Sequence, residues 1–474
     1  MLFNSFEFVI FFAAILLIYP LLGLRKQNIL LLVASYFFYG CWDWRFLSLI
    51  GFSTVVDYFC GRGIGATNSA VRKRHYLTIS LVTNLGLLAI FKYYNFFAEN
   101  LQDLFSIWGV SLDWITLNIV LPVGISFYTF QTLSYTIDVY RGRLQPEKDF
   151  LNFSLFVSFF PQLVAGPIER ASELLPQLNR NRCVSAEDVR IGCWLIFWGY
   201  FLKVFVADNL ALVVDQVFQN PQGGNGLEAL LGVYAFAFQI FGDFAGYSSI
   251  AIGVARLLGF TLMTNFLFPY FVTSPQEFWK HWHISLSSWL RDYLYISLGG
   301  NRYGELRTYR NLFLTMLLGG IWHGAAWTFV LWGVYQGFVL IVHRLVSPFL
   351  AYVQFGTKPM NAVWFVTRVF VMFQITCIGW LIFRADSLSQ VVSFLNAILF
   401  NVGGISDRAV YYMKYLGCYS LLMLMIQVYN WSHRNQYAIL QAPAIVKIAT
   451  FVLMFYCMAV WGEYGTQQFI YFQF

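Results

Sequence analysis

Charged residues are scarce in this chain of 474 residues, where Asp, Glu, Lys and Arg make up only 11% and hydrophobic residues 59%. A soluble domain carries about 25% charged residues and is about half apolar. The mean hydropathy of +0.61 likewise shows that the chain is unusually apolar. The scarcity of charge excludes an ordinary soluble domain and indicates a polytopic membrane protein.

Three widespread catalytic signatures are missing. The sequence holds no Gly-x-Ser-x-Gly turn, no Walker loop and no Gly-x-Gly-x-x-Gly fingerprint. These patterns present a serine nucleophile, cradle nucleotide phosphates and bind dinucleotides, respectively. Serine hydrolysis, phosphoryl transfer and hydride transfer are therefore unsupported.

Cysteines are few and scattered, and no pair has the spacing of a metal or redox site, so we expect them to be small core residues. They are Cys41, Cys60, Cys183, Cys193, Cys377, Cys418 and Cys457. The net charge of +7 reflects basic loops that orient helices and meet anionic lipid headgroups. Membrane lipid is the expected partner, and nucleic acid is not.

Long apolar runs recur along the chain, for example at residues 6–24, 76–91, 191–206 and 446–462. Several approach the roughly 20 residues that a spanning helix needs, and alternation of the β-barrel kind is absent. We therefore predict an all-α polytopic integral membrane protein with about 11 transmembrane helices. The first run lacks a basic leader and a cleavage site, which favours a retained helix. Arg25 and Lys26 after it place the N-terminus outside.

Polar and ionisable residues concentrate in interior segments, at residues 115–140, 155–170, 228–258 and 278–342. An ionisable side chain at the bilayer centre costs roughly 2.5 to 3.5 kcal/mol, so these segments should face a bundle interior or a wet cavity. We expect a single membrane domain over residues 1–474, with a catalytic core at about residues 115–342.

One such stretch, FWKHWHISLSSWLRDYLYISLGGNR at residues 278–302, is both aromatic and charged. Its spacing predicts a helix over residues 278–298. Trp282 lies on one stripe, whereas His283, Ser287 and Arg291 share an adjacent polar face. That face should point at water, at headgroups or at another polar group.

A second stretch, residues 311–342, is too long for one untilted pass and should break near Gly319, Gly320 and Gly324. His323 falls at this break. A broken helix at membrane depth is tolerated where it lines a cavity, and intramembrane histidines are functional candidates. The alternative is a structural histidine that donates to a neighbouring carbonyl.

Two histidines directed into one cavity suggest proton handling or metal binding. Metal binding is the weaker interpretation, because no third and fourth ligands stand at convincing spacing. Apolar burial favours the neutral imidazole, which can take a proton from a hydroxyl. General-base chemistry is therefore expected of His283 and His323.

Asp243 is a further charged group in an apolar segment, and two interpretations of it stay open. Tyr247, Ser248 and Ser249 lie about one turn away and could donate hydrogen bonds to it as part of a site. Alternatively, it anchors helix packing through Arg256 or a network of hydroxyls.

Several long motifs resemble the membrane-bound O-acyltransferase (MBOAT) family, and most closely its AlgI-type bacterial branch that acetylates alginate and other exopolysaccharides. They are FWKHWHISLSSWLRDYLYISLGGNR, LLGGIWHGAAWTFVLWG, LPVGISFYTFQTLSYTIDVYRG, FFPQLVAGPIER, FGDFAGYSSIAIGVARLLGF, WLIFRADS and the terminal FIYFQF. The similarity runs from about residue 28 to the last residue.

The resemblance implies tilted helices, some of them re-entrant or amphipathic, around a central funnel. It implies that His323, in the WHG motif, is catalytic and that His283 is its second polar partner. The side chains expected to line the substrate passage are Asp243, Trp282, Ser287, Arg291 and Trp322, together with Gly320 and Gly324. No bound cofactor or metal is implied.

The implied reaction moves an acetyl group from cytoplasmic acetyl-CoA to a hydroxyl on the far side of a bacterial inner (cytoplasmic) membrane. The acceptor belongs to an exported polysaccharide of the alginate or cellulose type, or to a periplasmic or extracellular partner acetyltransferase. An exopolysaccharide synthase complex is a further expected partner. Relatives that transfer D-alanyl groups or modify peptidoglycan remain alternatives. A transporter of an acyl carrier or of protons is the rival class, although paired broken repeats are absent from the sequence.

Overall fold

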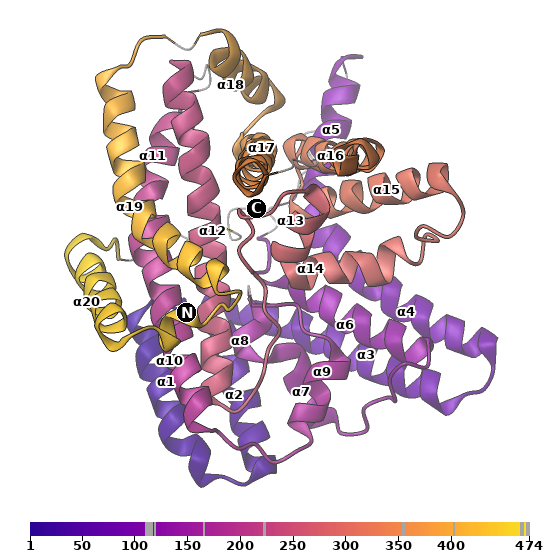
Figure 1. Cartoon of the computed structure of the whole chain (residues 1–474). Helices are drawn as coiled ribbons and strands as arrows, with labels where there is room; N and C mark the ends of the chain where they lie inside the picture. Colours follow the sequence, from indigo (N-terminus) through magenta and orange to yellow (C-terminus); the bar gives the residue numbers. More distant parts are fainter. Residues whose placement is uncertain are drawn as a thin grey trace. The chain divides into compact units, whose positions relative to one another are not determined.

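The computed structural model describes residues 1–109, 117, 120–164, 166–220, 224–352, 357–401, 403–464 and 469–470. Across these residues the regular structure is entirely helical, without a strand (Figure 1). The predicted core of residues 115–342 is described except for 115–116, 118–119, 165 and 221–223, and the terminal motif beyond residue 470 lies outside the description. The all-α prediction is confirmed.

The chain packs as two compact units, one formed by Met1–Cys193 with Ala251–Met263 and the other by Trp194–Ile250 with Thr264–Phe474. The first unit is built from α1 (Phe6–Ile18), η1 (Tyr19–Leu21), α2 (Leu24–Asp43), η2 (Trp44–Phe46), α3 (Leu47–Ala66), α4 (Ala70–Leu88), η3 (Ala89–Tyr93), α5 (Tyr94–Ser106), α6 (Ile125–Tyr140), α7 (Phe150–Ser158), α8 (Phe160–Leu163), α9 (Ala171–Leu178) and the start of α10 (Ala186–Tyr200).

Helices α3, α4 and α6 pack against one another in this first unit (Figure 1). Helix α6 is buried along nearly its whole length, on polar and apolar positions alike. Buried polar groups need hydrogen-bond partners. Thr132 and Ser134 donate to backbone carbonyls of α6 itself, and the Thr136 hydroxyl lies 2.9 Å from that of Ser80 on α4.

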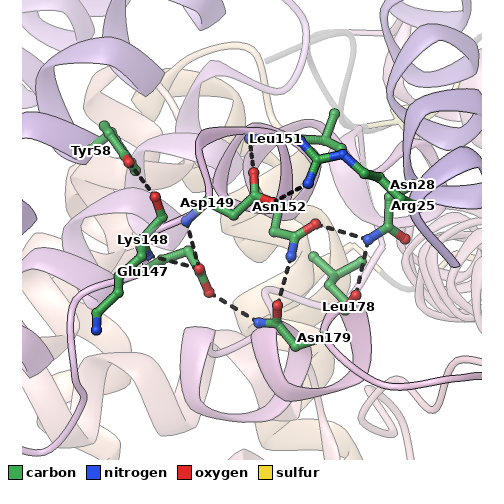
Figure 2. A network of polar contacts seen from close by, with 10 residues as sticks. All are labelled: Arg25, Asn28, Tyr58, Glu147, Lys148, Asp149, Leu151, Asn152, Leu178 and Asn179. Atoms are coloured by element: carbon green, nitrogen blue, oxygen red, sulfur yellow. Dashed lines mark hydrogen bonds and ion pairs between the residues drawn. The ribbon is translucent and has the colours of Figure 1, made fainter.

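The loop before α7 is held by a network of side-chain hydrogen bonds (Figure 2). The carboxylate of Glu147 accepts the backbone N–H groups of Lys148 and Asp149, and the Asn179 amide. Asn179 in turn accepts from Asn152 at 2.7 Å, and Asn152 accepts from Asn28 on α2 at 2.8 Å. Three segments far apart in sequence are joined this way.

The second unit contains the remainder of α10, η4 (Phe201–Ala207), α11 (Asp208–Phe218), α12 (Gly226–Leu257, which continues into the first unit), α13 (Pro275–His281), α14 (Ile284–Trp289), η5 (Leu290–Tyr295), α15 (Glu305–His323), α16 (Trp327–Tyr352), α17 (Lys358–Arg384), α18 (Leu388–Phe400), α19 (Asp407–Ser432), η6 (Ala438–Gln441) and α20 (Ala444–Trp461). Serine caps start three of them: Ser274, Ser387 and Ser406 accept N–H groups of α13, α18 and α19.

Seven helices among the described residues are long and apolar enough to cross a membrane, which makes the chain a multi-pass membrane protein. They are Ala70–Ser106, Ala186–Phe218, Gly226–Leu257, Trp327–Leu350, Lys358–Arg384, Asp407–Ser432 and Ala444–Trp461. Two shorter apolar helices are Phe6–Leu21 and Leu388–Phe400. The expected count of about 11 spans stays a prediction, as does the single domain over residues 1–474.

The cysteine prediction was only partly correct. Cys60, Cys377 and Cys457 are buried, as small core residues should be. The other four are exposed: Cys41, Cys183, Cys193 and Cys418. For Cys41, Cys193 and Cys418, apolar surroundings in the sequence did not imply burial, because a helix in a membrane protein also turns apolar residues outward; Cys183 lies between α9 and α10.

Candidate active site

The predicted continuous helix over residues 278–298 is wrong, because the chain breaks at Trp282 and His283. Helix α13 ends at His281, α14 begins at Ile284, and the π-helical turn η5 follows. Two backbone hydrogen bonds tie the break to an extended segment: Leu267 N–H donates to His281 at 2.9 Å and Ile284 N–H donates to Asn265 at 2.9 Å. Local spacing cannot reveal such bonds, since the partner segment lies well upstream.

His283 occupies the left-handed region of backbone space, with φ of 43°. For a residue with a Cβ this conformation costs roughly 1 to 2 kcal/mol and persists only where surrounding contacts enforce it. The two backbone bonds beside it supply that enforcement.

Asn265 holds the His283 ring, and sequence reasoning missed it. Its side-chain oxygen accepts the backbone N–H of Ser285 at 3.3 Å, which fixes the orientation of the amide. The same oxygen lies 3.2 Å from His283 Nδ1, so Nδ1 must donate the hydrogen. The lone pair is then on Nε2, the atom that a general base would use.

Burial keeps His283 neutral. The side chain is 1% exposed, and burial lowers its pKa to about 3. The residue lies outside the helices long enough to span a membrane. The imidazole is therefore uncharged at neutral pH, as predicted for a base.

His323 is the last residue of α15, and the chain turns at Gly324 before α16 begins at Trp327. The predicted helix break at this place is confirmed. The imidazole is buried and meets three aromatic rings edge to face: Trp322 at 5.0 Å, Trp332 at 5.0 Å and Phe383 at 5.3 Å between centroids. The rings come from α15, α16 and α17, so three helices converge on this histidine.

Trp322 connects the two histidines. Its ring centroid lies 5.0 Å from that of His323 and 6.4 Å from that of His283. The structure thus brings His283, Trp322 and His323 together, although 278–302 and 311–342 are separate stretches. Among the described residues, no group of three His, Cys, Asp or Glu side chains could hold a metal ion.

Gly320 and Gly324 have packing roles. A Cβ on Gly320 would stand 2.4 Å from the Phe329 carbonyl oxygen and 2.8 Å from the Gly333 Cα, because α15 and α16 touch backbone to backbone there. A Cβ on Gly324 would stand 2.1 Å from the Phe329 ring. Their role in substrate binding stays a prediction.

The other candidates on the broken helix lie in different environments. Trp282 is buried and packs on Trp380 at 4.7 Å and on Phe266 at 4.9 Å. Ser287 donates to the Trp282 carbonyl at 3.1 Å. Arg291 is exposed and pairs with the adjacent Asp292 at 2.7 Å. Trp282 therefore shares a ring neighbour, Phe266, with His283, whereas Arg291 lies at the surface.

Three of the partners expected for Asp243 bond to other groups. Arg256 donates to Asp188, Ser248 accepts from Asn265, and Ser249 donates to its own helix. Asp243 instead pairs with Lys203 of η4 at 2.9 Å and accepts the Ile470 N–H at 2.7 Å. Lys203 also lies 2.7 Å from Asp208, and all three charged side chains are buried. The sequence signal that could have revealed this ion pairing is Lys203, a lysine inside an apolar run.

A short chain of ring contacts joins Asp243 to His283. Phe244, the next residue on α12, meets the His283 ring edge to face at 4.6 Å. Phe469, next to the Ile470 that Asp243 binds, packs on Tyr247 at 4.7 Å and on Phe244 at 6.0 Å. Asp243 thus holds Ile470, and with it the neighbouring Phe469, against the Phe244 ring that contacts His283.

The sequence is similar to that of known membrane-bound acyltransferases. The sequence model of the MBOAT, membrane-bound O-acyltransferase family matches residues 147–385. The chain is 43% identical over 408 residues to a probable alginate O-acetylase AlgI of Pseudomonas aeruginosa, covering 85% of this chain and 75% of that protein. It is 40% identical over 445 residues to the Azotobacter vinelandii protein of that name, covering 92% and 86%.

A peptidoglycan O-acetyltransferase of Helicobacter pylori is 37% identical over 402 residues, covering 79% of this chain and 74% of that protein. The residues that contact one another around His323 and His283 lie largely inside the matched region. The chain belongs to the membrane-bound O-acyltransferase family and is an acyltransferase.

Proposed function

We propose that this chain is an O-acetyltransferase of the bacterial inner membrane. It takes an acetyl group from cytoplasmic acetyl-CoA and delivers it to a hydroxyl of an exported polysaccharide, of the alginate or cellulose type, or to a hydroxyl of a partner transferase. The support is the similarity to alginate O-acetylases over most of both chains. The substrate named for those relatives is the basis for proposing a polysaccharide here.

The single observation that carries the proposed chemistry is the position of His323. It ends a helix, lies at the break between α15 and α16, and is enclosed by aromatic rings next to a second, neutral histidine. Aromatic walls exclude water, which protects a thioester from hydrolysis and strengthens the electrostatic interactions of a base.

In the proposed reaction, His323 takes the proton of the acceptor hydroxyl as the oxygen attacks the thioester carbonyl carbon. The new C–O bond produces a tetrahedral oxyanion. Its collapse breaks the C–S bond, and the thiolate of CoA leaves and receives the proton from His323. An ester and free CoA thiol are formed, so atoms and charges balance.

The oxyanion needs hydrogen-bond donors. Gly319 and Gly320 lie within α15, whereas Gly324 follows its last residue, so the Gly324 N–H is the better backbone candidate. His283 is constrained differently, because its Nδ1 hydrogen is directed at Asn265. We therefore assign His283 the role of a neutral hydrogen-bond acceptor through Nε2.

Peptidoglycan is the second acceptor class, and the similarity to the Helicobacter pylori enzyme favours it. Both acceptors present sugar hydroxyls, so the chemistry at His323 is the same. Purified protein offered mannuronate oligomers or peptidoglycan fragments separates the two classes by which product carries label.

The test of the enzyme uses acetyl-labelled CoA ester and purified protein. Wild type should pass label to the acceptor, and His323→Ala should lose about 10²- to 10⁴-fold of the rate while remaining folded. His433→Ala, which changes an exposed histidine just after the end of α19, is the matched control and should retain full rate. Flux of an acyl carrier or protons across liposomes without covalent transfer would favour the transporter instead.

A further inference from the structure

A separate pocket lies in the second unit, where the end of α11 meets the start of α19 (Figure 1). Its volume of about 510 Å³ falls within the range of about 300 to 1,000 Å³ that is usual for small-ligand sites. We call it the Arg408 pocket. The described side chains that line it are Gln216, Gln219, Asp407, Arg408, Tyr411 and Tyr412. The proposed reaction at His323 uses none of them.

The distribution of basic residues places this pocket at the outer face of the membrane. The connections at its end of the spanning helices, residues 219–225 and 385–406, contain no lysine or arginine. Within four residues of the span ends on this side stand Arg384 and Arg408. The opposite ends of the same spans carry more, namely Arg182, Arg190, Arg256, Lys358 and Arg434. Because cytoplasmic loops hold the excess of basic residues, the Arg408 pocket faces the side on which an exported polymer is met.

The lining combines phenol rings with amide and charged groups, which is the mixture that a sugar ring needs. Tyr412 is 5% exposed and donates to Gln216 Oε1 at 3.4 Å, so this pair joins α19 to α11 on the buried side of the pocket. Tyr411 is 50% exposed and packs on Tyr415 at 5.4 Å, so its ring is held in place while part of it stays open. The C–H faces of a sugar pack on such a ring, and amides and carboxylates bond its hydroxyl groups.

Arg408 gives the pocket a positive charge that the described part of the chain does not pair. No carboxylate oxygen there lies within 4.0 Å of its guanidinium group. The acidic side chains at this end of the unit have other partners. Asp215 pairs with Arg384 at 3.1 Å, and Glu228 accepts the hydroxyl that caps α19 at 2.5 Å. Asp407 is the first residue of α19, where the helix N-terminus stabilises its charge. The guanidinium is therefore available to a carboxylate from outside, which it can bind through two parallel hydrogen bonds.

A lipid headgroup also carries an anion, but it brings acyl chains that need apolar surface beside the charge. The described lining of the Arg408 pocket includes no aliphatic side chain. A groove of about 250 Å³ elsewhere on the second unit has the apolar character that acyl chains need, and its lining is Pro359, Met360, Val363, Trp364 and Thr367. We propose that the Arg408 pocket holds a carboxylate-bearing sugar unit of the acceptor polymer, an inference that rests on the proposed function. A neutral chain of the cellulose type would leave Arg408 unpaired, so the pocket selects acidic polymers.

The test compares two tetrasaccharides of the same linkage, one of mannuronate and one of mannose, which differ only in the carboxylates. Calorimetry measures their binding to the purified full chain in detergent at constant ionic strength, without acetyl-CoA. Wild type should bind the mannuronate oligomer at least about 10-fold more tightly than the mannose oligomer. Arg408→Gln should bind the two alike, and Arg408→Lys should recover part of the difference, since it restores the charge without the planar fork. Lys414→Gln, which removes an exposed cation of α19 outside the pocket, should bind as wild type does.

Tyr411→Ala should weaken the binding of both oligomers alike, because its ring contacts the sugar and not the carboxylate. Equal binding of mannuronate by wild type and Arg408→Gln overturns the proposal, as does equal binding of the two oligomers by wild type. Loss of bound phosphatidylglycerol from Arg408→Gln with unchanged sugar binding also overturns it and identifies a lipid contact. Acetyl transfer without Arg408-dependent binding would refute this inference alone, whereas Arg408-dependent binding without any transfer would refute the proposed function alone.

Discussion

The ammonium group of Lys203 lies 2.9 Å from the Asp243 carboxylate and 2.7 Å from that of Asp208, with all three side chains buried. Two carboxylates share one cation in the interior of the second unit. Removing one partner of such a buried group leaves an uncompensated charge in the interior, and this strongly lowers the free energy of unfolding.

Lys203→Met should therefore lower the free energy of unfolding by about 3 to 5 kcal/mol, measured by chemical or thermal unfolding in detergent. The exposed pair of Arg190 and Glu187 provides the control, since Arg190→Ala should cost at most about 1 kcal/mol. If both variants lost the same free energy of unfolding, Lys203 would not be needed to neutralise the two buried carboxylates.

Asn265→Ala should slow acetyl transfer about 10-fold or more without weakening acetyl-CoA binding, because the acceptor that orients His283 Nδ1 is removed. Separate kcat and KM values check this.

Asn265→Asp keeps the oxygen that accepts from His283 and adds a negative charge beside the ring. It should therefore restore part of kcat and shift the pH profile of kcat to higher pH. Ser249→Ala, whose hydroxyl bonds only within α12, is the control. A rise in KM at constant kcat would contradict a positioning role.

Stability should depend on pH through His283. Burial lowers its pKa to about 3 from 6.5, so below about pH 6.5 the unfolded chain binds a proton that the folded chain does not. The free energy of unfolding should be highest above pH 6.5 and fall toward pH 3 by about 1.4 kcal/mol per unit from this residue alone. His283→Gln removes that contribution. Unfolding measured between pH 5 and 8 should give a shallower slope for the variant, and parallel slopes would disprove the assignment.

Gly320→Ala should lower the free energy of unfolding by about 1 to 3 kcal/mol, because its Cβ would stand 2.4 Å from the Phe329 carbonyl oxygen. Transfer should slow as well, since His323 lies one turn further along α15. Gly86→Ala on α4 meets nothing within 4 Å and should be neutral or slightly stabilising. Normal stability with weakened acetyl-CoA binding in Gly320→Ala would instead support direct contact with the substrate.

The helical class and the break after His323 could be predicted from sequence because both follow from local composition: long apolar runs form helices, and a run too long for one pass breaks at glycine. The break at His283 could not be predicted, since it depends on hydrogen bonds to residues 265–267. The pairing of Lys203 with Asp243 was hidden for a related reason. A lysine in an apolar run signals a buried anion, but spacing along one helix does not say which anion from another helix will meet it.

The backbone contact between α15 and α16 limits where space for a larger acyl group could be made beside His323. With no side chain between the two helices at Gly320 and Gly333, that side of the histidine cannot be enlarged by trimming residues. Under the proposed function, room for a longer acyl chain would have to come from the bulky rings that contact His323, above all Trp332 and Phe383. Engineering of donor range is best begun at those two positions.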